Sequence, residues 1–177
     1  MRPLRDHPED VRRRRTLHAL TLKRRTPPAV ALHVESYVPY LVNRAATAML
    51  NYAAADFAKF DLTVPQWRIL LTLWHHQVCR FGELATLTSI APPTLSRLLN
   101  TMRTSGIVKQ KRTEADSRSV EVSLTAAGRA LFEKTLPFAE RTNDLYTKGI
   151  SAADLNVVRR ALTTIYKNVR AQEDAER

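Results

Sequence analysis

Residues 82–106 of this 177-residue chain, GELATLTSIAPPTLSRLLNTMRTSG, decide the fold. Apolar residues recur at helical spacing in residues 82–88 and again in residues 92–104, and only three residues separate the two segments. Two consecutive prolines fit the first turn of the second segment, since the amide protons of that turn have no partner within a helix. Gly106 suits the left-handed position after a helix end. The stretch predicts a helix-turn-helix.

The residues after Gly106 change to a two-residue period. Residues 107–112 form one expected strand, and apolar and polar side chains alternate over residues 119–124 in another. Residues 113–117 link them and carry charged side chains. A β-hairpin with one apolar face and a charged tip, placed directly after a helix-turn-helix, is typical of a wing.

Long helices are expected on both sides of this region. An apolar period predicts one helix over residues 34–59, and Thr63 with Gln66 forms a capping box that opens a second helix. Two more helices are expected after the hairpin, over about residues 126–147 and from Ser151 onward. In the last one the apolar residues recur at alternating steps of three and four, the narrow seam used in contacts between helices of different chains. These apolar residues are Leu155, Val158, Leu162, Ile165 and Val169.

The chain is strongly basic. It has 28 Lys and Arg against 17 Asp and Glu, a formal net charge of +11. Such an excess indicates a polyanionic partner, nucleic acid before an anionic membrane surface. No run of apolar residues is long enough to span a membrane. A single cysteine, Cys79, excludes an internal disulfide and a multi-cysteine zinc site, and it suits a reducing compartment.

Residues 1–34 contain nine Arg or Lys and three Asp or Glu, a surplus of six positive charges. Without a clean apolar period, this segment is expected to be a basic, disordered extension of a domain that spans residues 35–172. Four interpretations stay open: a solvated extension, a start codon placed too early, an arm that binds DNA, and an amphipathic helix on a membrane surface.

Five motifs stand in order along the domain: LTVPQWRIL (62–70), ELA (83–85), TLSRL (94–98), GIV (106–108) and DSRSVEVSLTAAG (116–128). This succession resembles the MarR family, the multiple-antibiotic-resistance-type bacterial transcriptional regulators. The resemblance implies a mainly α-helical winged helix-turn-helix fold with long flanking dimerisation helices. The DNA-binding lobe would span about residues 62–125, and the homodimer would use about residues 34–59 and 126–172. It also implies a cytoplasmic repressor that leaves a palindromic operator when a small aromatic or phenolic compound binds.

The expected second helix of the helix-turn-helix offers polar side chains for the major groove of double-stranded DNA. Arg97 suits the O6 and N7 atoms of guanine, and Asn100 suits N6 and N7 of adenine. Thr94 and Ser96 suit a base edge or a phosphate, and Arg103 extends the same face. The alternative for Asn100 and Arg103 is a merely solvated face.

The expected hairpin contributes a second set of candidates. Arg118 at its tip suits a narrow minor groove, and Asp116 suits the orientation of a nearby arginine. The cations Lys109, Lys111 and Arg112 would attract the phosphate backbone, or else form a solvated strand face.

An effector pocket is implied only by the resemblance, between the first two helices, the long helix after the wing and the DNA-binding lobe. Tyr40, Arg44, Trp67 and His75 are its candidate lining residues. The alternative is that the aromatic residues belong to the core and that the arginine is solvated.

Cys79 is either an oxidation sensor or a small packed residue beneath the wing, in a short strand expected at residues 78–80. The adjacent His75 and His76 point about 100° apart on a helix, so they do not predict a metal pair. We therefore expect no metal site and no cofactor.

The sequence has no Gly-rich phosphate loop, no nucleophile elbow and no zinc-protease motif, so we expect no enzyme. The main rival to a ligand-responsive regulator is a constitutive or architectural DNA-binding protein. The two differ in the ratio of specific to non-specific affinity.

Overall fold

The computed structural model describes residues 33–112 and 120–176. The chain divides into two compact units, residues 1–43 and residues 44–177. Of the first unit, the described part contains the 3-10 turn η1 (Val34–Ser36) and the beginning of helix α2 (Val38–Ala58), which continues into the second unit. The long helix expected from residue 34 is therefore a short turn followed by α2.

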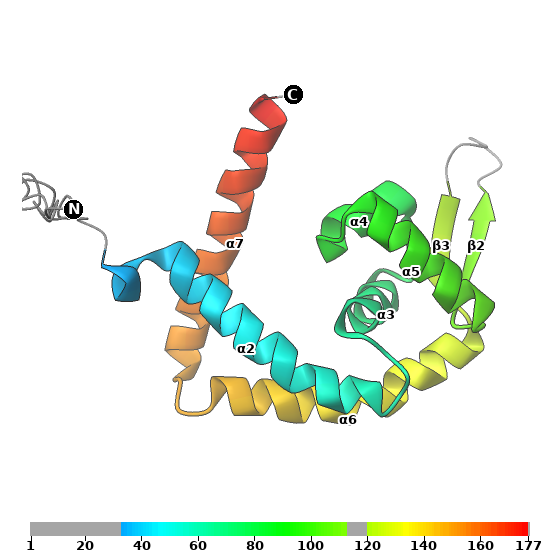
Figure 1. Cartoon of the computed structure of the whole chain (residues 1–177), viewed down its shortest axis with the longest axis horizontal. Coiled ribbons are helices and arrows are strands. Elements are labelled where there is room, and N and C mark those ends of the chain that lie inside the picture. The colour runs from blue at the N-terminus through cyan, green and yellow to red at the C-terminus, as the bar shows by residue number, and fades with distance from the viewer. Residues whose placement is uncertain (1–32, 113–119, 177) are drawn as a thin grey trace, which may run out of the picture. The chain divides into compact units, whose positions relative to one another are not determined.

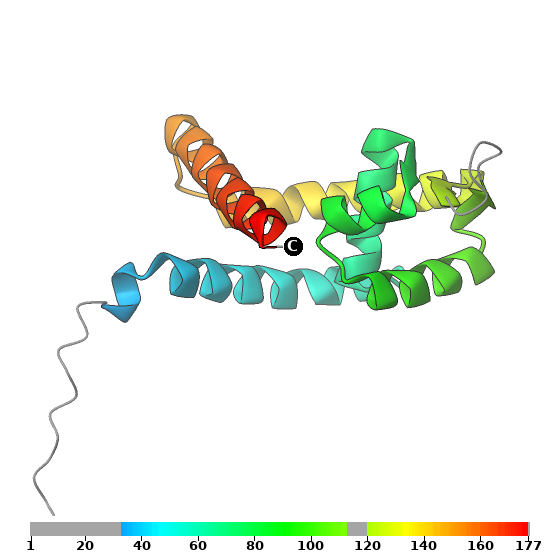
Figure 2. The same cartoon turned by 90° about the horizontal axis from the view of Figure 1, so that it is seen from above.

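The second unit has the element order that the sequence predicts (Figure 1). The C-terminal end of α5 leads into the first strand of the hairpin, and α6 starts at the end of the second strand (Figures 1 and 2). After α2 the elements are α3 (Val64–His76), β1 (Val78–Arg80), α4 (Phe81–Thr88), α5 (Pro92–Thr104), β2 (Val108–Arg112), β3 (Val120–Leu124), α6 (Ala126–Thr147) and α7 (Ala152–Ala175).

Local capping explains where the helices begin. Thr63 and Gln66 form the predicted capping box of α3, in which the Thr63 amide donates to Gln66 Oε1 at 2.9 Å. Helix α4 lacks a side-chain acceptor at its N-cap residue Arg80, and the Glu83 carboxylate instead accepts from the Arg80 amide at 3.4 Å. Gly106 has the left-handed φ of 71° expected after α5.

The three strands form an antiparallel sheet in the order β1-β3-β2. Cys79 of β1 and Gln110 of β2 both pair with Val122 of β3, while Val108 pairs with Leu124. Val108, Val122 and Leu124 are buried, so this face of the sheet covers the core.

The core lies between this sheet and helices α3 to α6. Helix α5 turns one side inward, where Leu95, Leu99 and Met102 are fully buried. The Arg68 guanidinium of α3 donates to the Thr88 carbonyl at 3.0 Å and so holds the end of α4. With its apolar side buried, α5 keeps its opposite face in solvent.

The hairpin is joined tightly to α6. Thr125 caps α6, and its amide donates to the Ile107 carbonyl at 3.1 Å while its hydroxyl donates to the Gly106 carbonyl at 2.5 Å. One turn later, a Cβ at Gly128 would collide with the Ile107 carbonyl oxygen. Glycine is therefore needed for the close approach of α6 to the base of the wing.

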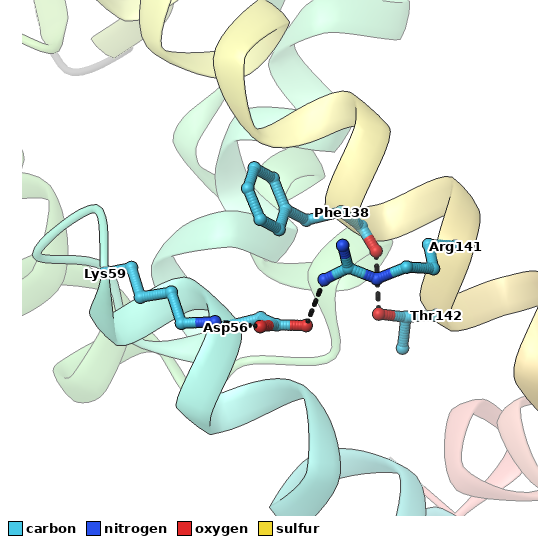
Figure 3. A network of polar contacts seen from close by, with 5 residues as sticks. All are labelled: Asp56, Lys59, Phe138, Arg141 and Thr142. Carbon is cyan, nitrogen blue, oxygen red and sulfur yellow. Dashed lines mark hydrogen bonds and ion pairs between the residues drawn. The ribbon is translucent and has the colours of Figure 1, made fainter.

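An ion-pair network joins the second half of α2 to α6 (Figure 3). Asp56 accepts from Lys59 at 2.7 Å and from Arg141 at 3.1 Å, and the Arg141 guanidinium lies 4.9 Å from the centre of the Phe138 ring. The hydrogen bonds from Lys59 and Arg141 hold the pKa of the Asp56 carboxyl below its usual range. Farther along, Tyr146 donates its hydroxyl to the Met49 carbonyl at 2.6 Å.

Helix α7 differs from the others in that none of its residues is buried. Ser151 and Asp154 form its predicted N-terminal cap. Its contact with the helix-turn-helix includes a 3.3 Å hydrogen bond from the Tyr166 hydroxyl to the Thr86 carbonyl. The apolar side chains along it are at least 40% exposed at Val158, Leu162, Ile165 and Val169.

Candidate nucleic-acid interface

The outward face of α5 carries the five polar residues that the sequence singles out, and all five are exposed: Thr94, Ser96, Arg97, Asn100 and Arg103. Four of them, all except Thr94, line a hollow of about 480 Å³ together with Gln110 of β2. Two arginine side chains thus line a concave, exposed surface, an arrangement that suits acceptor-rich DNA.

Side chains within this hollow are partly organised in the absence of DNA. Arg103 Nη2 donates to Asn100 Oδ1 at 2.9 Å, one helical turn away. The hydroxyl groups of Thr101 and Thr104 instead donate to the backbone carbonyls of Arg97 and Asn100. These threonines therefore bond to the helix itself, whereas the Arg103–Asn100 pair belongs to the exposed surface.

Alternation along β2 sorts its polar residues onto two faces. Gln110 and Arg112 lie on the same face of β2 as buried Val108, the face toward α5. Lys109 and Lys111 lie on the other face. Lys111 stands opposite Glu121, which also pairs with Arg80 of β1. The three cations expected to attract phosphate are all exposed, but they do not form one cluster.

Sequence reasoning missed Gln110, although a signal for it was present. The residue lies two positions after Val108, and a two-residue period places both on the same side of the strand. Which side of the strand faces α5 depends on how β2 packs against that helix, and the sequence period alone does not determine this. The predicted tip residues Asp116 and Arg118 lie outside the described residues.

A second cavity, of about 290 Å³, lies between α2, α3 and α6. Trp67 lines it and stacks on Phe57, with ring centres 4.7 Å apart. The buried Nε1 atom of Trp67 has no hydrogen-bond partner within the described parts of the chain. An unpaired buried donor is costly, so this indole is suited to an oxygen acceptor that enters the cavity.

The cavity contains one of the four predicted ligand residues. Trp67 lines it, but Arg44 and His75 do not and are exposed. The His75 ring instead packs edge-on against His76, with ring centres 5.0 Å apart. Tyr40 belongs to the first unit. Polar lining residues that the sequence did not indicate are Arg68, Thr142, Asn143 and Tyr146.

Cys79 is a packed residue in this structure. It is 1% exposed, and burial, assisted by the nearby charge of Glu83, raises the pKa of its thiol to about 11. A thiol that stays protonated at neutral pH is a poor nucleophile, which favours the packing interpretation over an oxidation sensor.

Among residues 33–112 and 120–176, no group of three or more His, Cys, Asp or Glu side chains could hold a metal ion. Across the same residues, no helix combines the length and the apolar character needed to cross a membrane.

Residues 62–120 match the model of the MarR family, a span from two residues before α3 to the first residue of β3. The organic hydroperoxide resistance transcriptional regulator of Bacillus subtilis (strain 168) is 28% identical over 138 residues. These residues make up 78% of this chain and 92% of that protein.

Two solved structures are similar as well. A MarR-family transcriptional regulator from Silicibacter pomeroyi is 26% identical with a TM-score of 0.71, over 77% of this chain and 92% of that one. BpsR of Bordetella bronchiseptica, whose DNA binding is regulated by 6-hydroxynicotinic acid, is 25% identical with a TM-score of 0.69, over 76% of this chain and 96% of that one. The prediction that this chain is not an enzyme is confirmed by these relatives. The family match, the similar structures and the winged helix-turn-helix geometry together show that residues 62–120 carry the DNA-binding region of a MarR-family transcriptional regulator.

Proposed function

We propose that this regulator binds a palindromic operator as a homodimer, represses transcription there, and leaves the DNA when a small aromatic acid binds. The observation that carries the DNA-binding part is the exposed polar face of α5, with Arg97 and Arg103 around one hollow. A major groove accepts a helix of this kind, and its base edges present acceptors to both guanidinium groups.

The apolar surface of α7 supports the homodimer. Its seam of Val158, Leu162, Ile165 and Val169 is exposed along one helix, and monomeric proteins rarely expose apolar patches of this kind. A second copy offers the same seam, and a two-fold interface buries both at once. Residues 126–172 and 34–59 would then form the dimer, and residues 62–125 would bind DNA. The two α5 helices would meet half-sites about 34 Å apart.

Contacts made by residues at the start of α5 and on the hairpin would position the protein on the DNA. Thr94 and Ser96 lie in the first turns of α5 and suit a phosphate or a base edge. Lys109, Lys111 and Arg112 would attract the backbone, and Arg118, oriented by Asp116, would enter the minor groove. Such a bacterial regulator would act in the cytoplasm, where the chromosome lies.

The cavity beside Trp67 supports the proposed effector. Its lining is mainly apolar and includes Phe57 and Tyr146, so it suits a flat ring, and the unpaired Trp67 Nε1–H offers a donor to a carboxylate or phenolic oxygen. In BpsR, 6-hydroxynicotinic acid regulates DNA binding. A hydroxylated aromatic acid is therefore the class of compound we propose for this chain. The cavity favours this switch over a constitutive or architectural protein.

Binding to an operator taken from genomic binding-site mapping tests the DNA-binding proposal. In fluorescence anisotropy at fixed salt, a regulator should prefer its operator to random DNA by roughly 10³-fold or more. A ratio near one would instead identify an architectural protein. A reporter gene placed behind the operator then distinguishes repression from activation.

The effector is tested with 6-hydroxynicotinic acid and 4-hydroxybenzoic acid as probes, added to the protein–operator complex. Release of the DNA by either probe supports the switch. Trp67→Phe keeps the ring but removes the Nε1–H, so it should weaken the response by roughly fivefold, the effect of one lost hydrogen bond. Trp74→Phe, which changes the other tryptophan of the chain, is the matched control. An unchanged response in Trp67→Phe would contradict the proposed contact.

A further inference from the structure

We propose that Asn100 and Arg103 act as one hydrogen-bonded unit that selects guanine in the operator. This inference rests on the proposed function, because it specifies which base the exposed face of α5 recognises. The two side chains are exposed on adjacent turns of the helix and are joined by the 2.9 Å hydrogen bond from Arg103 Nη2 to Asn100 Oδ1.

This hydrogen bond fixes the orientation of the Asn100 amide. A guanidinium has donors only, so the group that receives its N–H must be the amide oxygen and not the amide nitrogen. The Nδ2 group, with two donors, is then left for a ligand, and it has no partner among the described residues. The pair therefore presents N–H groups from both residues to the hollow.

The exposed chemistry of the pair differs from that of a lone asparagine. A lone asparagine reads adenine by accepting from N6 with its oxygen while donating to N7 with its nitrogen. Here that oxygen already receives an N–H of a cation, and the amino group of adenine would approach beside the positive charge of Arg103. Guanine presents acceptors at both O6 and N7, which match a donor-only surface.

The surroundings keep this unit in place. Arg103 is in the last turn of α5, where its positive charge is favourable to the helix dipole, and Asn100 precedes it by three residues. The same hollow is bounded on the strand side by Gln110. Because the hydrogen bond between the two side chains forms without DNA, it reduces the conformational entropy lost on binding.

Selection of binding sites from a randomised DNA library, followed by sequencing, tests this inference with the full-length protein. In each half-site the wild-type chain should enrich a guanine at the position that Asn100 and Arg103 contact, distinct from the guanine expected for Arg97. In Arg103→Ala the Asn100 oxygen becomes available, so the preference at that position should change from guanine to adenine. The ratio of guanine to adenine should change by about tenfold or more.

Two further variants complete the test. Asn100→Ala should weaken the guanine preference without producing an adenine preference. Thr101→Ala is the matched control, because Thr101 is exposed on the same helix but bonds only to the Arg97 carbonyl, and it should retain the wild-type preference. Thermal unfolding of each variant shows that it is folded.

The possible failures are distinguishable. If the wild-type chain enriches no sequence, the proposed function fails and the inference fails with it. If the wild type enriches a palindrome but Arg103→Ala retains the same base at every position, only the pairing of Asn100 with Arg103 is overturned. The pairing is also overturned if no guanine in the wild-type half-site depends on Arg103 for its enrichment.

Discussion

Helices α5 and α7 are both amphipathic, but they leave opposite kinds of surface in solvent. In α5 the apolar residues Leu95, Leu99 and Met102 are fully buried and the polar residues are exposed. In α7 no residue is buried, and apolar side chains such as Leu162 and Ile165 stay exposed. The contrast separates two kinds of partner: a polar, charged ligand for α5 and an apolar surface for α7.

The largest effect should come from placing charges on the apolar seam of α7. In the double variant Leu162→Glu and Ile165→Glu, each subunit would place two carboxylates in the proposed interface, four in all, so the dimer should dissociate. Losing the second DNA-binding lobe should weaken operator affinity by at least about 100-fold. Light scattering and anisotropy measure the two effects.

The control for that variant is Thr163→Glu, on the same helix but outside the seam, with a hydroxyl that donates only to the Arg159 carbonyl. It should remain dimeric. A wild-type chain that is already monomeric at micromolar concentration would refute the proposed role of α7.

The next effect should come from the polar face of α5. Arg97→Ala leaves α7 and the buried side of α5 unchanged, so the oligomeric state should be preserved. Operator affinity should fall by about tenfold to 100-fold, with relaxed preference at one base position, since a bidentate contact of arginine with guanine is lost. Competition with singly substituted operators measures the change.

Lys111→Ala provides the comparison for Arg97→Ala, because a residue that contacts phosphate should weaken all DNA sequences alike. Equal losses on operator and random DNA for Arg97→Ala would remove this arginine from the base-reading set.

A smaller effect, on stability alone, should come from the contact between α6 and the base of the wing. This contact belongs to neither of the two partner surfaces. Gly128→Ala forces a Cβ against the Ile107 carbonyl, so the free energy of unfolding should fall by about 2 kcal/mol. Gly82→Ala is the matched control, since a Cβ there meets nothing within 4 Å, and it should be neutral or slightly stabilising. Chemical denaturation measures both. A Gly128→Ala protein as stable as wild type would contradict the close packing of α6 on the wing.

At neutral pH the smallest effect should come from the ionisation of Cys79. Burial raises the pKa of its thiol to about 11 from an ordinary value of 9.0, so the native state favours the protonated form. The stabilisation is complete below about pH 9 and is lost as the pH rises toward 11. Cys79→Ala should therefore show a shallower decline in unfolding free energy over this range.

The same thiol should react with a disulfide reagent at pH 8 only after unfolding. Rapid labelling of the native protein, or loss of operator binding in hydrogen peroxide that Cys79→Ala abolishes, would show instead that this cysteine is a sensor.

Local signals in the sequence were sufficient to predict the elements. The capping pairs at Thr63 and Ser151, the prolines that open α5 and the left-handed Gly106 each act within a few residues, and the structure confirms them. The exposed face of α5 was predictable for the same reason, because helical spacing separates its buried and exposed residues.

The parts that the sequence did not predict depend on contacts between distant elements. Gln110 lines the hollow because β2 packs against α5, and the cavity at Trp67 exists because α2, α3 and α6 meet there. His75 was a reasonable candidate by its chemistry, but α3 turns it into solvent. Helical spacing places Asn100 and Arg103 close enough for a hydrogen bond. Whether the bond forms depends on the rotamer of Arg103, which the folded surface determines.

Thr125 has a mechanical consequence. Its amide and hydroxyl hold the carbonyls of Ile107 and Gly106, and Gly128 leaves no space between α6 and that same segment. The base of the wing and the first turn of α6 are therefore joined by two hydrogen bonds and a close backbone contact. A change in the direction of the first turn of α6 would therefore also shift Gly106 and Ile107 at the base of the wing.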